Sequence, residues 1–363
     1  MVSPLLFPTE LVGSYTKPRW LCDHERVYGP EGTWWKVGEA DLAEAQDDAC
    51  HLAIADQIEA GLTFVTDGEQ RRQTFSGFFN KLTGIDEKER GEVKNFASDL
   101  GDAITMKKRP DAPAGAAMPK FTLPRVTGPI GWPGPMLVND LDFLKATAAG
   151  RALSKITLIG PNSLALRLVD EHYGSPAKVA FAVADALNQE IHALASLGVD
   201  LIQIDEPEVH FRYSQCQDFA VEAIDRALRG VTVRTAVHMC YGYSKNIAEK
   251  KANPVYEQAL ALLAATQVDE ISLEYEQPAH QPELLTHAGN KAVILGVLNL
   301  DTEAPVETPA HIASRVRAAA QVIPKEKLRL GPDCGMWFLP RVRAFGKLRA
   351  MAQAAEILRR EFA

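Results

Sequence analysis

The sequence predicts an α/β protein of the TIM (β/α)8 barrel class, and three observations lead to this prediction. Helical segments alternate with short apolar runs, as is typical of a parallel sheet. Eight such runs occur, which is the number of strands in the barrel. Polar side chains that can bind ligands follow most of these runs, and barrel enzymes carry their active sites at this end of the strands. A doubly wound open sheet is the structural alternative.

The eight predicted strands are short and mostly apolar. In chain order they cover residues 10–14, 62–69, 155–161, 201–207, 233–240, 270–275, 293–300 and 328–335. Residues 76–125 interrupt the alternation, because "RPDAPAGAAMP" is a loop sequence and "FTLPRVTGP" has the pattern of an extra strand. We interpret this span as an excursion after the second strand, a hairpin near the barrel mouth. The whole chain, residues 1–363, is interpreted as one domain.

Composition and charge exclude several classes of protein. Hydrophobic residues make up 46% of the chain and charged residues 24%, as in ordinary soluble domains. The formal net charge of -8 argues against nucleic-acid binding, and no apolar run approaches the roughly 20 residues of a membrane span. The N-terminal residues lack the pattern of a signal peptide, and the 5 cysteines do not form a disulfide framework. We therefore expect a cytoplasmic protein with neither nucleic-acid nor membrane partners.

The stretch "VRTAVHMCYGYS" contains two metal-binding side chains two positions apart. Residues i and i+2 of a strand face the same side, so His238 and Cys240 can both point into the barrel mouth. Alone, this pair more often indicates a buried cysteine beside a hydrogen-bonded histidine than a metal site. However, Glu274 in "SLEYE" and Cys334 in "GPDCG" close two further strands. Thiolate, imidazole and carboxylate groups together favour zinc, and three protein ligands with one replaceable position are typical of a catalytic site.

Two acidic residues, Glu69 and Asp205, also follow predicted strands. A pair of carboxylates at the barrel mouth suits a bound ammonium group better than a sulfonate. The alternative for each residue is a helix cap or a packing acid.

Six short motifs carry a resemblance to a known family. "LVGSY", "TDGEQRR", "QIDEP", "HMCYGY", "SLEY" and "GPDCG" occur in the order seen in the catalytic barrel of cobalamin-independent methionine synthase. The resemblance extends from about residue 8 to residue 340. It implies a zinc ion bound by His238, Cys240, Glu274 and Cys334. It also implies that the amino-acid part of homocysteine is held by Ser14, Glu69 and Asp205.

The chain departs from the family pattern in three ways, which concern its length, proton transfer and the methyl donor. The chain has no room for the second, N-terminal barrel of the large methionine synthases, so it resembles their single-barrel relatives. Where the family has a histidine that assists proton handling, "GVLNLDTEAP" places Asp301. Asp301 is therefore a candidate catalytic residue, together with Asp205 and Glu69. Where the family has a tryptophan against the folate ring, this chain has Arg167. The thiol half of the chemistry is therefore better supported than the donor half.

The expected function is that of a zinc-dependent thiol methyltransferase or alkyltransferase of the methionine-synthase type. A bound zinc deprotonates a thiol, with homocysteine favoured, and the zinc thiolate attacks the carbon of a methyl or alkyl donor. The donor is left open between a folate, another methyl donor and an epoxide. An alternative is an enzyme similar to epoxyalkane:coenzyme M transferase, in which Arg71, Arg72 and Arg167 are candidate partners of the sulfonate. A non-catalytic zinc- or thiol-binding protein is the third hypothesis.

Overall fold

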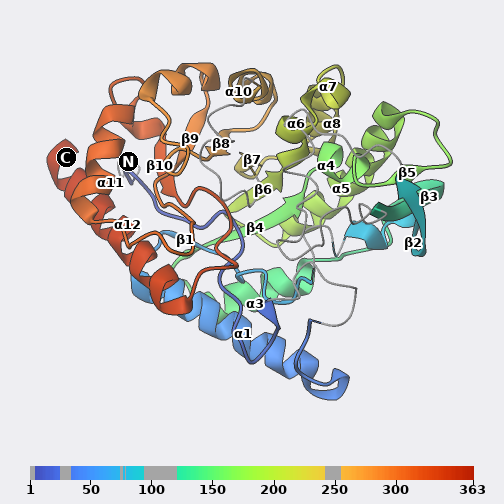
Figure 1. Ribbon diagram of the computed structural model, residues 1–363, viewed down its shortest axis with the longest axis horizontal. Coiled ribbons are helices and arrows are strands. Elements are labelled where there is room, and N and C mark those ends of the chain that lie inside the picture. The colour runs from blue at the N-terminus through green and yellow to red at the C-terminus, as the bar shows by residue number, and fades with distance from the viewer. Residues whose placement is uncertain (1–4, 25–33, 74–76, 78, 94–120, 242–254) are drawn as a thin grey trace, which may run out of the picture.

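The computed structural model describes residues 5–24, 34–73, 77, 79–93, 121–241 and 255–363. It confirms the predicted fold class, because a curled sheet of seven parallel strands lies inside a layer of helices (Figure 1). In their order across the sheet, the strands are β1 (Phe64–Val65), β4 (Leu153–Ile159), β6 (Leu201–Asp205), β7 (Thr235–Met239), β8 (Glu270–Leu273), β9 (Ala292–Gly296) and β10 (Leu328–Gly331).

Each of these strands overlaps a predicted strand and ends before the predicted end. The predicted strands included the polar, glycine and proline residues that follow most of the apolar runs, and these residues lie past the last paired residue. The consequence matters for the site, because Cys240, Glu274 and Cys334 lie just beyond β7, β8 and β10 rather than within them.

The first predicted strand, residues 10–14, is wrong in its position. Pairing of the N-terminal segment falls instead on residues 8–10, where Thr9 forms an isolated parallel bridge with Leu330 of β10. On its other side, the Thr9 carbonyl accepts a hydrogen bond from the Phe64 amide of β1 at 3.0 Å. A short segment therefore takes the eighth strand position and joins the two edges of the seven-stranded sheet.

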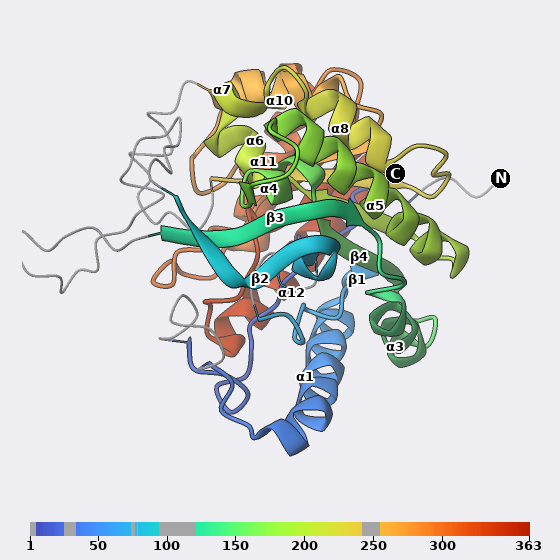
Figure 2. The same cartoon turned by 90° about the vertical axis from the view of Figure 1, so that its right-hand side faces the viewer.

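A second, three-stranded sheet lies beside the parallel one. β2 (Thr83–Val93) pairs antiparallel with β3 (Phe121–Gly131), and β3 pairs parallel with β5 (Val169–Asp170). Figure 2 shows β2 and β3 crossing in front of the parallel strands. This antiparallel pair is the hairpin expected after the second predicted strand, although residues 94–120 of the expected excursion lie outside the described residues. The one-domain interpretation stays a prediction.

The described helices cover the outside of the parallel sheet. They are α1 (Glu39–Ala60), α3 (Val138–Ala148), α4 (Pro161–Ala165), α5 (Pro176–Ser196), α6 (Pro207–Phe211), α7 (Tyr213–Cys216), α8 (Ala220–Ala227), α10 (Tyr256–Ala264), α11 (Pro309–Ala319) and α12 (Arg341–Phe362), with 3-10 turns η2 (Phe79–Lys81), η3 (Pro282–Ala288) and η4 (Lys325–Lys327).

Local sequence explains where several helices begin and end. α4, α5, α6 and α11 each start with proline, whose fixed φ suits the first helical position. The N-cap of α11 is Thr308, whose side chain accepts a hydrogen bond from the His311 amide. α1 ends at Gly61 with φ of 90°, a left-handed conformation that glycine adopts without steric cost. No helix in the described part of the chain is long and apolar enough to cross a membrane.

The barrel interior combines apolar packing with buried ion pairs. Phe64, Leu201, Ala236 and Ile294 form one buried apolar cluster between strands. Lys155 and Glu10 are both completely buried, and Lys155 Nζ lies 2.6 Å from Glu10 Oε2. Because buried charges are costly unless paired, this pair fixes residue 10 against β4 and holds the closing segment in place.

Candidate metal centre

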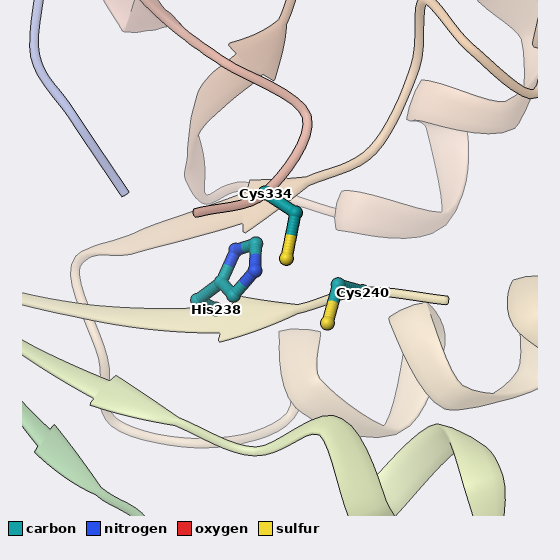
Figure 3. Close-up of side chains that lie close together, drawn as sticks. All are labelled: His238, Cys240 and Cys334. Atoms are coloured by element: carbon teal, nitrogen blue, oxygen red, sulfur yellow. The ribbon is translucent and has the colours of Figure 1, made fainter. Parts of the chain in front are cut away.

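Three of the predicted zinc ligands lie together at the C-terminal ends of the strands. His238 comes from β7, Cys240 directly follows β7, and Cys334 follows β10. One ligand atom from each lies within 4.8 Å of the others, and all three residues are buried. Figure 3 shows the imidazole and the two sulfur atoms turned toward one another. Segments nearly 100 positions apart in the sequence thus supply one nitrogen and two sulfurs to a single small space.

A neighbouring hydroxyl orients the imidazole of His238. Its Nδ1 atom lies 2.9 Å from Ser272 Oγ of β8. Its other ring nitrogen, Nε2, is buried and has no nitrogen or oxygen hydrogen-bond partner among the described residues. A proton on Nδ1 leaves the Nε2 lone pair available, which is the usual arrangement of a metal-binding histidine. The residues present therefore fit a metal ion.

The local electrostatics also favour a cation. Burial alone would lower the pKa of His238, but the Cys240 thiol and the Asp205 and Glu274 carboxylates outweigh it and raise that pKa. A hydrogen bond with Cys240, together with burial, raises the pKa of Cys334 well above its ordinary value. His238 and Cys334 thus retain their protons because several negative groups lie close to them. A divalent cation would take their place and release them on binding.

The fourth predicted ligand, Glu274, is adjacent to the three-residue cluster but not a member of it. It follows β8 and is completely buried. Its Oε1 atom accepts a hydrogen bond from the Tyr241 amide at 2.8 Å, and the Tyr256 hydroxyl contacts its backbone. The backbone of Glu274 is thus fixed close to Cys240, and its carboxylate rests on the amide that follows Cys240.

Glu69 occupies a constrained position beyond β1. Its backbone has φ of 55°, a conformation that non-glycine residues rarely adopt. Its Oε1 atom accepts hydrogen bonds from Arg72 Nη1 at 3.0 Å and from Thr157 Oγ1 at 2.7 Å. The Lys17 ammonium donates to its carbonyl oxygen. Strained backbone at a buried acid is a recurrent feature of functional sites.

Asp205 and Ser14 are the other two residues predicted to hold homocysteine. Asp205 ends β6 and pairs in register with His238 of β7. Burial raises the pKa of Asp205 to about 7, opposed by His238 and reinforced by the negative charge of Glu69. Ser14 is buried, and its carbonyl accepts a hydrogen bond from the Met336 amide, two residues after Cys334. Asp205 is therefore next to a residue of the metal cluster, and the Ser14 backbone is bound to the segment that carries Cys334.

The predicted cationic residues are already paired with acids. Arg72 binds the Glu69 carboxylate, and its Nη2 atom also donates a hydrogen bond to the Thr157 carbonyl oxygen at 2.6 Å. The Arg167 guanidinium lies 2.8 Å from Glu208.

Asp301, the residue at the position of the family's proton-handling histidine, hydrogen-bonds within the turn to which it belongs. Its Oδ1 atom accepts a hydrogen bond from the Glu303 amide at 2.9 Å. The side chain is half-buried. The carboxylate thus has a hydrogen-bond partner within its own turn, and it is not a member of the three-residue cluster.

Sequence reasoning missed Ser272 and Thr157, which contact His238 and Glu69. Ser272 belongs to β8 and lies two positions before Glu274, so strand alternation could have placed it on the ligand-bearing side. Thr157 lies in the predicted strand "KITLIGP", where alternation likewise fixes the side that it faces. Its partner Glu69 is 88 positions away in sequence, so the contact could not be predicted.

The fold and the site together define a class of barrel enzymes, and comparison with known proteins agrees. The family model described as "Cobalamin-independent synthase, Catalytic domain" matches residues 147–357. The chain belongs to this family, and the predicted family resemblance is confirmed. The class is therefore that of cobalamin-independent methyltransferases of methionine biosynthesis.

Individual relatives match over nearly the whole chain. Methionine synthase of Saccharolobus solfataricus is 32% identical over 359 residues, covering 98% of this chain and 96% of the relative. Methionine synthase of Sulfolobus acidocaldarius is 30% identical over 357 residues, covering 98% and 93%. Among solved structures, the B12-independent methionine synthase from Shewanella sp. W3-18-1, in complex with selenomethionine, is 33% identical with a TM-score of 0.83, covering 98% of this chain and 99% of that one.

Proposed function

We propose that this protein is a zinc-dependent S-methyltransferase that uses homocysteine as the thiol. The observation that carries the proposal is the cluster of His238, Cys240 and Cys334 beside the acids Glu69 and Asp205. When bound, zinc would supply the positive charge that deprotonates the substrate thiol and holds it for attack on the methyl carbon. One imidazole and two thiolates leave a coordination position for that thiol. Glu274, whose charge acts on both His238 and Cys334, is the candidate for a further, replaceable ligand.

The two acids suit the amino group of an amino-acid thiol. The charge of Glu69 raises the pKa of Asp205, which means that the two carboxylates repel one another. An ammonium group bound between them would relieve this repulsion. The Shewanella relative is described in complex with selenomethionine, the selenium analogue of methionine, and this supports an amino-acid product for the present chain as well.

The contacts of the arginines disfavour the coenzyme M alternative. A sulfonate would need an available cation, but Arg71 lies 2.6 Å from Asp47 and Arg72 lies 3.0 Å from Glu69. Arg167 is likewise bound to Glu208. Binding a sulfonate would require breaking one of these pairs, two of which involve largely buried arginines.

Zinc-edge X-ray absorption on the purified protein tests the proposal. We expect a first shell with about two sulfurs and one imidazole, and a further sulfur when homocysteine is added. Coenzyme M serves as the control thiol and should leave the shell unchanged. A first shell that neither thiol alters, or a protein that binds no zinc, would contradict the proposal. A new sulfur with coenzyme M alone would favour the epoxide-opening alternative.

A further inference from the structure

Asp333, the residue before Cys334, is completely buried and binds a neighbouring loop. Its Oδ1 atom accepts hydrogen bonds from the amides of Tyr275 at 3.1 Å and Glu276 at 3.0 Å. Its Oδ2 atom accepts one from the Gln277 amide at 2.6 Å. Three consecutive amides therefore point at one carboxylate, an arrangement that compensates its burial.

The carboxylate reaches this loop across an intervening strand. Asp333 follows β10 and the bound loop follows β8, while β9 lies between them in the sheet. The last residue of β9 is Gly296, and a Cβ atom there would overlap the Asp333 carboxylate and lie 2.7 Å from the Leu273 carbonyl. Glycine is required at this position because the acid occupies the space of its side chain.

This contact joins two segments that carry proposed metal ligands. Asp333 is covalently next to Cys334, and the loop that it binds begins one residue after Glu274. We propose that Asp333 is a positioning residue of the metal centre, which fixes the Cys334 and Glu274 backbones relative to one another. The inference rests on the proposed function only in that it assumes these residues bind the metal. Neutralising or displacing the carboxylate would then weaken metal binding without removing any ligand.

Glu206 offers a matched comparison. It is buried, and it accepts hydrogen bonds from the amides of Asn162 at 3.0 Å and Ser163 at 2.8 Å. It also requires a glycine, because a Cβ atom at Gly160 would overlap its carboxylate. The Asn162 and Ser163 amides belong to the start of α4, which carries no proposed metal ligand.

The two acids therefore have the same structural role in the barrel. The Glu206 amide donates a hydrogen bond to the His238 carbonyl at 2.8 Å. However, the segment that the Glu206 carboxylate holds carries no proposed ligand, whereas the segment that Asp333 holds begins next to Glu274.

Zinc affinity of the full-length protein, measured by competition with a chromophoric chelator, tests the inference. Asp333→Asn keeps the shape but replaces one acceptor oxygen with a donor that faces an amide. We expect zinc affinity to fall about 10- to 100-fold, the range found for groups that orient metal ligands. Glu206→Gln should lower thermal stability to a similar degree and leave zinc affinity within about twofold. Unchanged zinc affinity in Asp333→Asn, with lowered thermal stability, would overturn the inference and leave a purely structural role.

Two additions keep the result interpretable. His238→Ala in the same assay reports on the metal centre itself, because an unchanged zinc affinity there refutes the ligand assignment rather than the role of Asp333. Hydrogen–deuterium exchange on the unsubstituted zinc-loaded protein requires no variant to fold. The amides of residues 275–277 should be strongly protected, and exchange at the rate of an unstructured peptide would overturn the inference.

Discussion

The Nδ1 atom of His238 lies 2.9 Å from the hydroxyl oxygen of Ser272 on the adjacent strand. This contact fixes both the ring plane and the nitrogen that faces the cysteines. Ser272→Ala should therefore lower zinc affinity about tenfold while the three ligands remain. Chelator competition measures the change. Ser196→Ala, which removes an exposed hydroxyl on α5, is the control and should leave zinc affinity unchanged.

Removal of the metal should destabilise the protein. A ligand that binds only the folded state, at a free concentration about 100 times its Kd, adds about 2.7 kcal/mol to the free energy of unfolding. We expect the melting temperature to fall when zinc is removed with a chelator and to recover when zinc is restored. His238→Ala should abolish the difference between the two conditions. Equal melting temperatures of the metal-free and zinc-loaded unsubstituted protein would count against the metal centre.

Glu69→Gln should weaken binding of homocysteine. The amide retains the shape of the side chain but loses the negative charge that faces the substrate ammonium. We expect affinity for homocysteine to fall at least about tenfold, or 1.4 kcal/mol, with zinc affinity unchanged. The homocysteine analogue that lacks the amino group is the matched control, because it should bind both proteins equally. An equal loss for both thiols would show that Glu69 acts on something other than the amino group.

Arg72→Met should destabilise the fold, because it leaves the largely buried Glu69 carboxylate without its cationic partner. Removing one member of a buried ion pair typically costs about 3–5 kcal/mol. Arg317→Met breaks a well-formed pair with Glu361 that is substantially exposed, and its cost should stay below about 1 kcal/mol. Urea unfolding of the two variants measures the difference. Equal effects would mean that the Arg72 pair is as weak as a surface pair.

Lys17 should make stability depend on alkaline pH. Its ammonium lies 5.7 Å from the Trp34 ring centroid and 5.0 Å from that of Trp337, and burial lowers its pKa from 10.5 to about 8. Between these two values the unfolded chain binds a proton that the folded chain does not, so stability rises with pH across this window. Below pH 8 both states are protonated and the contribution is constant.

Lys17→Met isolates this effect. The unfolding free energy of the unsubstituted protein minus that of the variant should increase from pH 8 toward pH 10.5. Urea unfolding at several pH values measures it. A difference that stays flat over this range would show that the lysine keeps its ordinary pKa, and a difference that falls would show that folding raises it.

The ligand cluster could be predicted from the sequence because each of its side chains lies at or just beyond the end of a strand. "HMC" and "GPDCG" each span the end of a strand, and the parallel topology brings the carboxyl ends of strands together. His238, Cys240 and Cys334 could therefore be placed in one mouth without coordinates.

The partners of charged side chains could not be predicted in this way. Arg167 was a candidate for an anionic substrate, yet it binds Glu208, which is 41 positions away in sequence. Ion pairs of this kind depend on how loops fold over the sheet, which strand periodicity does not report. The same reason explains the misplaced first strand, since pairing of Thr9 depends on residues more than 300 positions later.

Closure of the barrel by Thr9 has a consequence for folding. The bridge to Leu330 joins segments more than 300 positions apart, so the ring cannot be completed until residue 330 has been synthesised. Contacts between residues so distant in sequence are slow to form. Cys334 lies four residues beyond this bridge. Ring closure and metal binding therefore both require the last strand to have been synthesised. We therefore expect nascent chains that stop before residue 328 to be open, metal-free and sensitive to proteolysis.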